Sequence, residues 1–500
     1  IRMSYWSTAL TDYSPLERWG ETKMGMTILL LLLTGTGASD AGRDFIDVGD
    51  RAQMFIDGMF FETSNNISLH VAAPAKTNEQ TLVADRPWEN ASLNWFSVMD
   101  DAGKFRMWYE CYDVEGWPTA DDTSFCYAES ADGIHWNKPS LGLFFYHGSN
   151  ENNILFRQIG DGGARSRVHG ACVFKDPNAA AEARYKAVSQ GSFAGFEPPQ
   201  RIAGMASADG VHWSRVSKPI CDVFADSQFS GFWDAELGSY VLFGRVAGRG
   251  RSIGRSSSTV FERFEALSLV FQADERDPSD GDLYNPAVLK YPFADRVYLM
   301  FTSMYRHTSD SLDIHLAVSR DGIHWAWAER GVPFVPLGAA GNFDSGSLYM
   351  GQGMIRVQDE IWQYYSGSPL KHNEAELDAL TKAENRRIFS RVVSRLNGFV
   401  SADAGDAEGS FITPPLTFKG SGLELNAKVH EQGYVRVALL DAAGQPLAGF
   451  GGEDCISVSG DSCAASVSWK SGSDLARLAG TPVKLAVTMK NASLFAFRFK

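Results

Sequence analysis

The chain has 500 residues, a length that indicates two to four structural units rather than one ordinary compact domain, although repeat folds and barrels can be larger. Apolar residues make up 44% of the chain and aromatic residues 12%, which is ample for a large core. The formal net charge is -14 and no basic run marks a phosphate-binding face, so we expect no nucleic-acid partner.

The N-terminal segment has the plan of an export signal. An apolar run at residues 27–34 follows Lys23 and precedes small residues at 35–39, and it is too short to span a bilayer. We therefore expect residues 1–39 to be an upstream extension and a signal peptide, which predicts a secreted or periplasmic protein with no further membrane association. A buried N-terminal helix is the alternative interpretation of the same run.

A seven-residue motif occurs three times, as Ser-Ala-Asp-Gly-Ile-His-Trp at 130–136, Ser-Ala-Asp-Gly-Val-His-Trp at 207–213 and Ser-Arg-Asp-Gly-Ile-His-Trp at 319–325. Each copy lies between a strand-like run and another apolar run. Because an Asp-Gly pair in that setting is a strong hairpin signal, the motif predicts one turn that is used once in each repeated sheet.

Strand-like runs group around these turns into five blocks of four short strands, at residues 94–146, 167–224, 229–271, 283–335 and 347–400. Four antiparallel strands per block, with the turn after the third, is how a propeller blade is built. We therefore predict an all-β chain with a five-bladed β-propeller at residues 40–405, whose last sheet is completed by a strand from residues 45–83. Short strands without the motif predict a small C-terminal β-sandwich at residues 410–500.

The six cysteines admit fifteen disulfide connectivities in an exported protein. Cys111 and Cys126 are expected on adjacent strands, and Cys455 and Cys463 flank a polar loop, so both pairs are candidates for bridges. Free buried cysteines are the alternative, and no C-x-x-C spacing indicates a zinc site.

Six segments resemble those of a known family: Gln-Met-Phe-Ile-Asp at 53–57, Arg-Pro-Trp-Glu at 86–89, Lys-Phe-Arg-Met-Trp-Tyr at 104–109, Asp-Gly-Ile-His-Trp-Asn-Lys-Pro at 132–139, Phe-Asp-Ser-Gly at 343–346 and Leu-Asn-Gly-Phe-Val-Ser at 396–401. With them the chain is similar to the five-bladed propeller glycosidases, the clan of arabinanases, β-xylosidases and invertases, and more closely to a group of exported bacterial glycosidase-like proteins. The resemblance implies a propeller fold and a carbohydrate substrate. The seven-residue motif also resembles the Asp-box of sialidases, a structural motif, so we expect Asp132, Asp209 and Asp321 to fix hairpins rather than to act in catalysis.

In a propeller the first strand of each blade lines the central funnel, where glycoside hydrolysis needs two carboxyl groups, one to donate a proton and one to activate water or attack carbon. The catalytic candidates are acidic residues near the starts of first strands, and the histidine that stands there in the second block: Glu89, Asp344, Asp282 and His169. The structural alternatives are a capped turn, a surface carboxylate and a hydrogen-bonding strand histidine.

Six further residues near the same strand ends are expected to bind substrate: Trp88, Glu110, Asp226, Arg245, Tyr284 and Asn285. Arg245, together with Arg249 and Arg251, can pair bidentately with an anionic sugar or can only balance the charge of this acidic chain. The acidic loop at 274–282 suggests calcium but fits no EF-hand spacing. The sequence therefore predicts no cofactor and no metal site, with calcium as the alternative.

We predict an exported glycoside hydrolase that acts on a plant or algal polysaccharide or oligosaccharide through carboxylates in the funnel. One alternative is a non-catalytic glycan-binding surface protein on the same fold, in which no two funnel carboxyl groups lie within about 5 to 10 Å of each other. A second alternative is a sialidase-like enzyme, which needs several arginines and a tyrosine beside an acid in the funnel. The sequence leaves the sugar, the linkage, the stereochemistry and the oligomeric state open.

Overall fold

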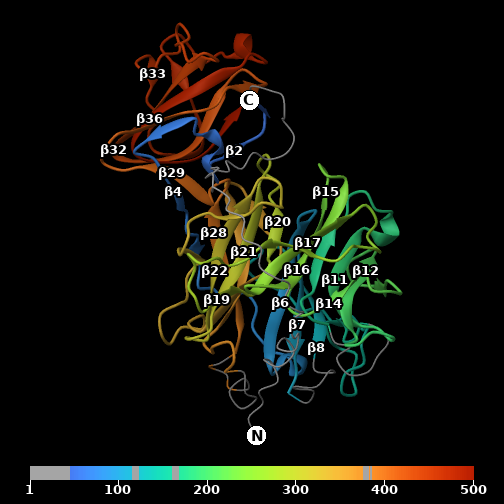
Figure 1. Ribbon diagram of the computed structural model, residues 1–500. Coiled ribbons are helices and arrows are strands. Elements are labelled where there is room, and N and C mark those ends of the chain that lie inside the picture. Colours follow the sequence, from blue (N-terminus) through green and yellow to red (C-terminus); the bar gives the residue numbers. More distant parts are fainter. Residues whose placement is uncertain (1–44, 115–122, 160–167, 375–381, 383, 385) are drawn as a thin grey trace, which may run out of the picture. The chain divides into compact units, whose positions relative to one another are not determined.

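The computed structural model describes residues 45–114, 123–159, 168–374, 382, 384 and 386–500 (Figure 1). The segment at 1–39, with the predicted signal peptide, lies outside these residues. Within them every regular element is a β-strand or a short 3₁₀ helix, which confirms the all-β prediction. The 3₁₀ helices are η1 (Gly58–Phe60), η2 (Pro87–Glu89), η3 (Ala181–Ala183) and η5 (Ala476–Leu478). In this part of the chain no helix has the length and apolar character needed to cross a membrane.

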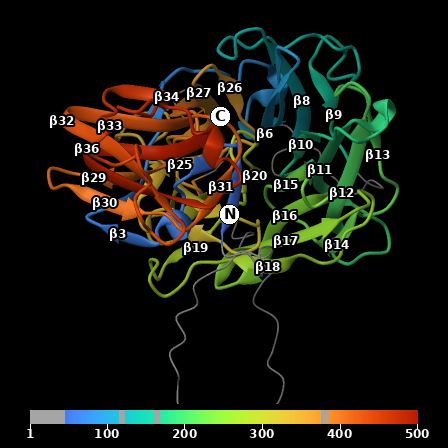
Figure 2. The same ribbon diagram turned by 90° about the horizontal axis from the view of Figure 1, so that it is seen from above.

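Most strands pair into antiparallel groups, which we call units one to five in chain order (Figures 1 and 2). Unit one contains β6 (Ser92–Asp101), β7 (Lys104–Tyr112), β8 (Thr123–Ser130) and β9 (Ile154–Phe156). Unit two contains β10 (Cys172–Lys175), β11 (Tyr185–Ser192), β12 (Gln200–Ser207) and an outer layer of β13 (Trp213–Arg215) and β14 (Cys221–Phe224). Unit three contains β15 (Ser230–Asp234), β16 (Ser239–Gly248), β17 (Gly250–Ser258) and β18 (Ser268–Phe271).

Units four and five have first strands that are each split in two. In unit four, β19 (Gly281–Leu283) and β20 (Val288–Lys290) pair with β21 (Tyr298–Arg306), followed by β22 (Ser311–Ser319), β23 (Ala326–Trp327) and β24 (Pro333–Val335). In unit five, β25 (Ser347–Met350) and β26 (Ile355–Val357) pair with β27 (Glu360–Ser368), followed by β28 (Ile388–Arg395) and β5 (Ala75–Lys76). The last outer strand therefore comes from the N-terminal segment, where the sequence placed it.

The units form a closed circle. The first strands of units one to four are in contact, β6 with β10, β10 with β15 and β15 with β20. Between units four and five, the third strand β22 pairs in parallel with the first strand β25. The circle closes where the backbone N–H of Val98 donates to the Gln352 carbonyl at 2.8 Å. Only glycine fits beside this contact, because a Cβ on Gly353 would lie 2.1 Å from the Val98 carbonyl oxygen and φ there is +86°. A closed circle of four-stranded units is the arrangement of a β-propeller, with the first strands nearest its centre.

Apolar side chains hold adjacent units together. Trp108 and Tyr127 of unit one share one buried cluster with Val173 and Tyr185 of unit two. The next residues along the same strands, such as Tyr109 and Phe174, point to the opposite face and belong to other buried clusters, so that both faces of a sheet pack on neighbouring parts of the propeller. The core therefore lies between the units rather than within a single sheet.

The seven-residue motif forms the expected turn after the third strand of units one, two and four. In the second copy, Asp209 Oδ1 accepts hydrogen bonds from the backbone N–H of Val211 and His212, each at 2.8 Å. The Gly210 carbonyl of the same turn accepts from the indole N–H of Trp108 in unit one, at 2.6 Å. The motif thus fixes a hairpin and also joins neighbouring units.

Replacing Asp209 by alanine is expected to lower the free energy of unfolding by about 1–2 kcal/mol, because two turn N–H groups lose their acceptor. Urea unfolding at neutral pH measures this change. Asp222→Ala is a matched control, since this carboxylate is 69% exposed and bonds only Arg201 in the described structure. A variant as stable as the control would contradict the role of the turn.

The remaining strands form a second β region that contains both ends of the described chain. Its main sheet consists of β1 (Ile46–Gly49), β2 (Gln53–Met54), β3 (Thr63–Asn65), β4 (Ser68–Val71), β29 (Val400–Ala404), β30 (Gly409–Ile412), β31 (Leu416–Phe418), β32 (Leu423–Asp441), β34 (Asp461–Ser466) and β36 (Val483–Phe499), beside the pair β33 (Cys455–Ile456) and β35 (Ser468–Trp469). The long strands β32 and β36 pair along most of their length and change register at two bulges. Such bulges bend and twist a strand pair.

The N-terminal strands differ from the predicted domain boundaries. Residues 40–405 were expected in the propeller, yet β1 to β4 pair with β31, β36, β30 and β29 of the second region. The cause is the apolar segment around η1, because Phe55 and Phe60 pack on Phe411 and Phe497 in the core of that region. One short segment therefore serves both β regions.

All six cysteines are free thiols in this structure. Cys111 Sγ and Cys126 Sγ lie 3.6 Å apart on adjacent strands, and both are buried. Cys455 and Cys463 contact different groups: the former accepts from the Val437 N–H, and the latter lies near the Asp359 carbonyl. The two candidate pairs thus differ, since only the first has its sulfur atoms side by side.

Candidate functional site

Polar and aromatic side chains gather where the first strands begin, the second strands end and the third strands begin. These three places lie at one end of each unit, because neighbouring strands are antiparallel. We call this group the central cluster, and its members are Asn94, Trp95, Glu110, Tyr112, His169, Asp226, Arg245, Arg251, Asp282, Tyr284, Tyr305, His307, Tyr349, His372 and Arg387. All five units contribute to it.

His169, just before β10, lies between two carboxylates. Its Nδ1 is 3.5 Å from Glu110 Oε2, and its Nε2 is 3.7 Å from Asp226 Oδ1. The Tyr112 hydroxyl is 3.2 Å from the same Nδ1. Since the two nitrogens of an imidazole are only about 2 Å apart, the two carboxylate oxygens lie within roughly 10 Å of each other, close to the spacing of hydrolytic carboxyl pairs.

The two carboxylates have different surroundings. Glu110, on β7, is completely buried; its Oε1 accepts from the Ala171 N–H at 2.8 Å, and its Oε2 has no hydrogen-bond partner among the described residues. Asp226 has a side chain that is 26% exposed, and it accepts from Arg245 Nη1 at 2.6 Å. Burial acts to lower the pKa of Arg245, but the carboxylate of Asp226, together with Tyr284 and Asp282, outweighs it and raises this pKa above its ordinary value. Asp226 is therefore the accessible end of a carboxylate–imidazole–carboxylate chain, and Glu110 is the buried end.

A second carboxylate–imidazole pair comes from unit four. Asp282, on β19, is buried, and its Oδ2 accepts from the backbone N–H of Arg251 at 3.2 Å and from Nη1 of the same residue at 3.1 Å. Nε2 of His307 lies 3.0 Å from the same oxygen, and half of the histidine side chain is exposed. A buried carboxylate thus holds an accessible imidazole.

Three aromatic rings lie beside these pairs. The ring centre of Tyr349 is 4.8 Å from that of Trp95 and 5.5 Å from that of Tyr284. The indole N–H of Trp95 is buried and has no hydrogen-bond partner in the described part of the chain. Aromatic faces of this kind suit a sugar ring, and the indole is a donor available to a hydroxyl group.

Guanidinium groups lie over these rings. The guanidinium carbon of Arg245 is 4.5 Å from the centre of the Tyr284 ring, and that of Arg251 is 5.2 Å from it. The guanidinium carbon of Arg387 is 4.9 Å from the centre of the Tyr349 ring. Cation–π contacts of this length are attractive and keep each side chain in place.

The structure brings six of the ten predicted site residues together and places four elsewhere. Those in the central cluster are His169, Asp282, Glu110, Asp226, Arg245 and Tyr284. Those outside it are Glu89, Asp344, Trp88 and Asn285.

Glu89 lies in η2 and is completely buried. Its Oε1 accepts from the Tyr109 hydroxyl at 2.6 Å, and its Oε2 accepts from Lys138 Nζ at 2.6 Å. The same Oε2 also accepts from the backbone N–H groups of Asp85 and Arg86. The carboxylate thus caps its own turn and neutralises a buried lysine.

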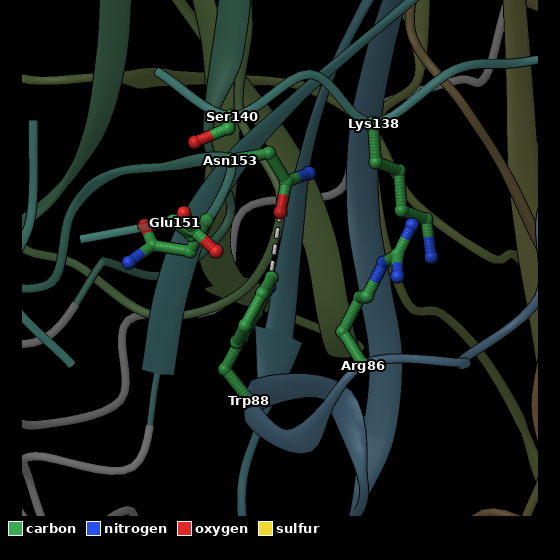
Figure 3. Close-up of a pocket in the computed structure, with 7 residues that line it drawn as sticks. Arg86, Trp88, Lys138, Ser140, Glu151 and Asn153 are labelled. Atoms are coloured by element: carbon green, nitrogen blue, oxygen red, sulfur yellow. Dashed lines mark hydrogen bonds between the residues drawn. The ribbon is translucent and has the colours of Figure 1, made fainter. Parts of the chain in front are cut away.

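A pocket of about 290 Å³ lies over this turn (Figure 3). It is lined by Arg86, Trp88, Lys138, Ser140, Glu151, Asn152 and Asn153. The indole N–H of Trp88 donates to Asn153 Oδ1 at 3.0 Å, the dashed line in Figure 3. Glu151 is the one carboxylate in this lining, so the pocket offers no carboxyl pair and is separate from the central cluster.

Asp344 and Asn285 are also engaged in internal contacts. Asp344 is buried, and its Oδ2 accepts from Lys76 Nζ at 2.7 Å and from the Tyr365 hydroxyl at 2.9 Å. Asn285 is completely buried, and its amide donates to Gln228 Oε1 at 2.7 Å. Both side chains therefore bridge strands of the propeller.

Nine members of the central cluster were not among the ten predicted site residues, and they include Tyr112, His307, His372 and Arg387. Tyr112 and His307 lie at the ends of second strands, and Arg387 directly precedes a third strand. The antiparallel rule that pointed to Glu110 applies equally to these positions, so the signal was present in the sequence. His372 belongs to the connection before the third strand of unit five and had no such signal.

No group of three or more His, Cys, Asp and Glu side chains in the described structure is arranged to hold a metal ion. In the acidic loop that suggested calcium, Asp274 and Asp277 pair with Arg330, and Asp274 also pairs with Arg276. These carboxylates are therefore neutralised by arginines.

A scan against protein-family models finds no match, and neither does a search of curated proteins. Among solved structures, the chain is similar to one described as a glycoside hydrolase, with 16% identity and a TM-score of 0.46 over 64% of this chain and 92% of that one. It is similar to an N-acetylgalactosamine deacetylase from F. plautii in complex with blood group B trisaccharide, with 17% identity and a TM-score of 0.45 over 65% and 95% of the two chains. It is similar to a glycosyl hydrolase from Bacteroides ovatus, with 12% identity and a TM-score of 0.43 over 71% and 98%. At these values, what those proteins act on is not transferred to this chain.

Proposed function

We propose that the protein is an exported glycoside hydrolase whose reacting groups belong to the central cluster. The observation that carries the proposal is the presence of two carboxylate–imidazole pairs from different units, Asp226 with His169 and Asp282 with His307. Each pair is joined through an arginine to the ring of Tyr284. Hydrolysis of a glycosidic bond needs two such proton-handling groups and a place for the sugar between them.

Asp226 is the group that works on water or on the anomeric carbon. Its carboxylate is accessible, and Arg245 fixes its position and balances part of its charge. When this carboxylate gains a proton from water, His169 and the buried Glu110 behind it share the change in charge. This row of neighbouring charged groups thus stabilises the state that develops during the reaction.

His307 is the group that donates a proton to the leaving oxygen. Its imidazole is half exposed, and the buried carboxylate of Asp282 lies 3.0 Å from its Nε2. A carboxylate in that position fixes the orientation of the ring. The partly exposed ring of Tyr284, which packs on the buried rings of Trp95 and Tyr349, supplies apolar surface for a sugar.

The carboxyl spacing also bears on the non-catalytic alternative. That alternative expected no two carboxyl groups within about 5 to 10 Å of each other near the propeller centre. The oxygens of Glu110 and Asp226 lie within this limit, because one imidazole bridges them. The spacing that the non-catalytic alternative expected is therefore not found, and the buried Glu110 can act on a substrate only through His169.

The test compares the wild type with Asp226→Asn on a panel of plant and algal polysaccharides, with release of reducing sugar as the readout. We expect the wild type to cleave at least one glycan, and the variant to lose about 10³-fold in kcat because the reacting carboxylate is gone. Asp222→Asn is the matched control, since it removes the acid of another 2.6 Å Arg–Asp pair, on the outer layer of unit two. If the wild type cleaves nothing, or Asp226→Asn equals the wild type, the hydrolase proposal fails and glycan binding takes its place.

The sialidase-like alternative has one supporting observation. It required arginines and a tyrosine beside an acid, and Arg245 and Arg251 meet Tyr284 next to Asp226. This arrangement favours a substrate that carries negative charge.

A further inference from the structure

We propose that the central cluster recognises the oxyanion of an acidic glycan, a sugar carboxylate or a sulfate ester, through the guanidinium of Arg387. This inference rests on the glycosidase function proposed above and names the substrate class of the same site.

Arg387, directly before β28, is a guanidinium without an acidic partner. Its Nη1 donates to Ser366 Oγ at 3.3 Å and its Nη2 donates to Ser347 Oγ at 3.1 Å. Both partners are neutral hydroxyl groups, and no carboxylate of the described residues forms an ion pair with this arginine. A guanidinium has five N–H donors in a fixed fork, so with two in use three remain for a ligand.

The other two arginines of the cluster are compensated. Arg245 pairs with Asp226 at 2.6 Å, and Arg251 pairs with Asp282 at 3.1 Å. Three guanidiniums therefore share two paired carboxylates. A partly buried cation without a counter-charge is unfavourable, and a bound oxyanion would remove that cost through charge-assisted hydrogen bonds.

The surroundings of His372 show which charges act on the region beside Arg387. Its Nδ1 is 2.8 Å from the Tyr349 hydroxyl, on the ring that Arg387 covers. Burial, and after it the charge of Arg251, lower the pKa of His372 to about 3, while Asp310 opposes them. Nearby arginines, including Arg387, thus outweigh the acid that faces this imidazole, and the local surroundings favour an anion over a cation.

The ligand chemistry follows from the neighbours of Arg387. A pyranose ring can lie against the partly exposed Tyr284, whose ring centre is 5.5 Å from that of Tyr349, while its oxyanion meets the remaining N–H groups of the guanidinium. A neutral sugar would leave these donors without partners, so a site of this kind rejects it. Carboxylates and sulfate esters both present two oxygens that match the guanidinium fork.

The experiment measures binding by calorimetry, and hydrolysis, with the full chain. The carboxylate probes are oligosaccharides of polygalacturonate, alginate and glucuronoxylan, each beside its carboxyl-reduced counterpart. The sulfate probes are oligosaccharides of a sulfated galactan beside their desulfated counterparts. We expect the wild type to bind at least one acidic member about 10-fold or more tighter than its neutral counterpart, and the responding class identifies the oxyanion.

The variant Arg387→Gln is expected to bind the acidic ligand about 10- to 100-fold more weakly and to change binding of the neutral one by a much smaller factor, because the charged hydrogen bonds serve only the oxyanion. Arg356→Gln is the matched control, since this arginine also lies over an aromatic ring, Phe293, at 5.3 Å and outside the cluster. Thermal unfolding checks that both variants fold. If Arg387→Gln does not fold, the comparison of acidic with neutral probes on the wild type and on Arg387→Lys decides.

The inference is overturned if acidic and neutral counterparts bind equally, if no acidic probe binds, or if Arg387→Gln weakens both kinds alike. Its failure differs from failure of the hydrolase proposal. If the wild type hydrolyses only neutral glycans and Asp226→Asn abolishes this, the hydrolase proposal stands and the acidic substrate class is wrong. If an acidic probe binds through Arg387 but is not cleaved, the anion site stands and the hydrolase proposal is wrong.

Discussion

Replacing Glu110 by glutamine is expected to lower kcat about 10²- to 10⁴-fold on any glycan that the wild type hydrolyses, with little change in KM. The side chain is completely buried, so it acts on the reaction through His169, whose Nδ1 is 3.5 Å from Glu110 Oε2. Glutamine keeps an acceptor for the Ala171 N–H and removes the negative charge beside the imidazole. The chain that ends at Asp226 then loses the group that shares its charge.

Steady-state kinetics over a range of pH measure this effect, with urea unfolding as a check on the fold. Glu110 is a positioning residue, so the pH dependence of kcat should move in the variant, which a merely structural role would not produce. Unchanged kcat and an unchanged pH profile in a folded variant would contradict the role of the chain.

Replacing Glu89 by glutamine is expected to do the opposite: to lower the free energy of unfolding by about 3 kcal/mol and to leave kcat of the folded enzyme unchanged. Glu89 is as buried as Glu110, but its partner is Lys138, whose side chain is only 6% exposed. Without the carboxylate this lysine keeps only Asp85 as an acidic partner, at the surface. A buried ammonium that loses its counter-charge accounts for the size of the effect.

Urea unfolding and thermal unfolding measure the loss, and Asp85→Asn is the control. This carboxylate contacts the same lysine but is 52% exposed, so its removal should cost less than about 1 kcal/mol. The two substitutions then have different effects: Glu110→Gln lowers kcat, and Glu89→Gln lowers the free energy of unfolding. A Glu89→Gln protein that is stable and inactive would return Glu89 to the reacting groups.

The repeated strands and turns were predictable because their signals are local. An alternating strand and an Asp-Gly turn each occupy a few neighbouring residues, and the turn at Asp209 forms as its sequence indicates. The partners of the N-terminal strands were not predictable in this way. Ile46 pairs with Leu416, and Phe55 packs on Phe411, contacts that leave no mark on the sequence next to either residue.

The site was predictable to the extent that antiparallel pairing fixes which strand ends meet. That rule indicated His169 and Asp282 from first strands and Glu110 from a second strand, and it extends to His307 and Arg387. The rule does not predict in which direction a side chain at a strand end points.

Glu89 and Asp226 both precede first strands by a few residues, and both are carboxylates. Lys138 comes from a distant connection and draws Glu89 into the turn, whereas Arg245 of the next strand holds Asp226 in the cluster. The position of each carboxylate, in the turn or in the central cluster, depends on which cationic side chain contacts it. That contact exists only in the folded chain.

The strand β5 has a consequence for how the chain is made. Lys76 pairs with Val392, and Ala75 with Val393, so the ribosome releases this strand more than 300 residues before its partner. At about 5 to 20 residues per second the wait lasts about 15 to 60 s, during which β5 has no sheet to join. β5 is thus synthesised early but pairs late, and it is the strand that a chaperone at the tunnel exit would need to protect. A circular permutation that placed β5 after β28 in the chain would remove the delay.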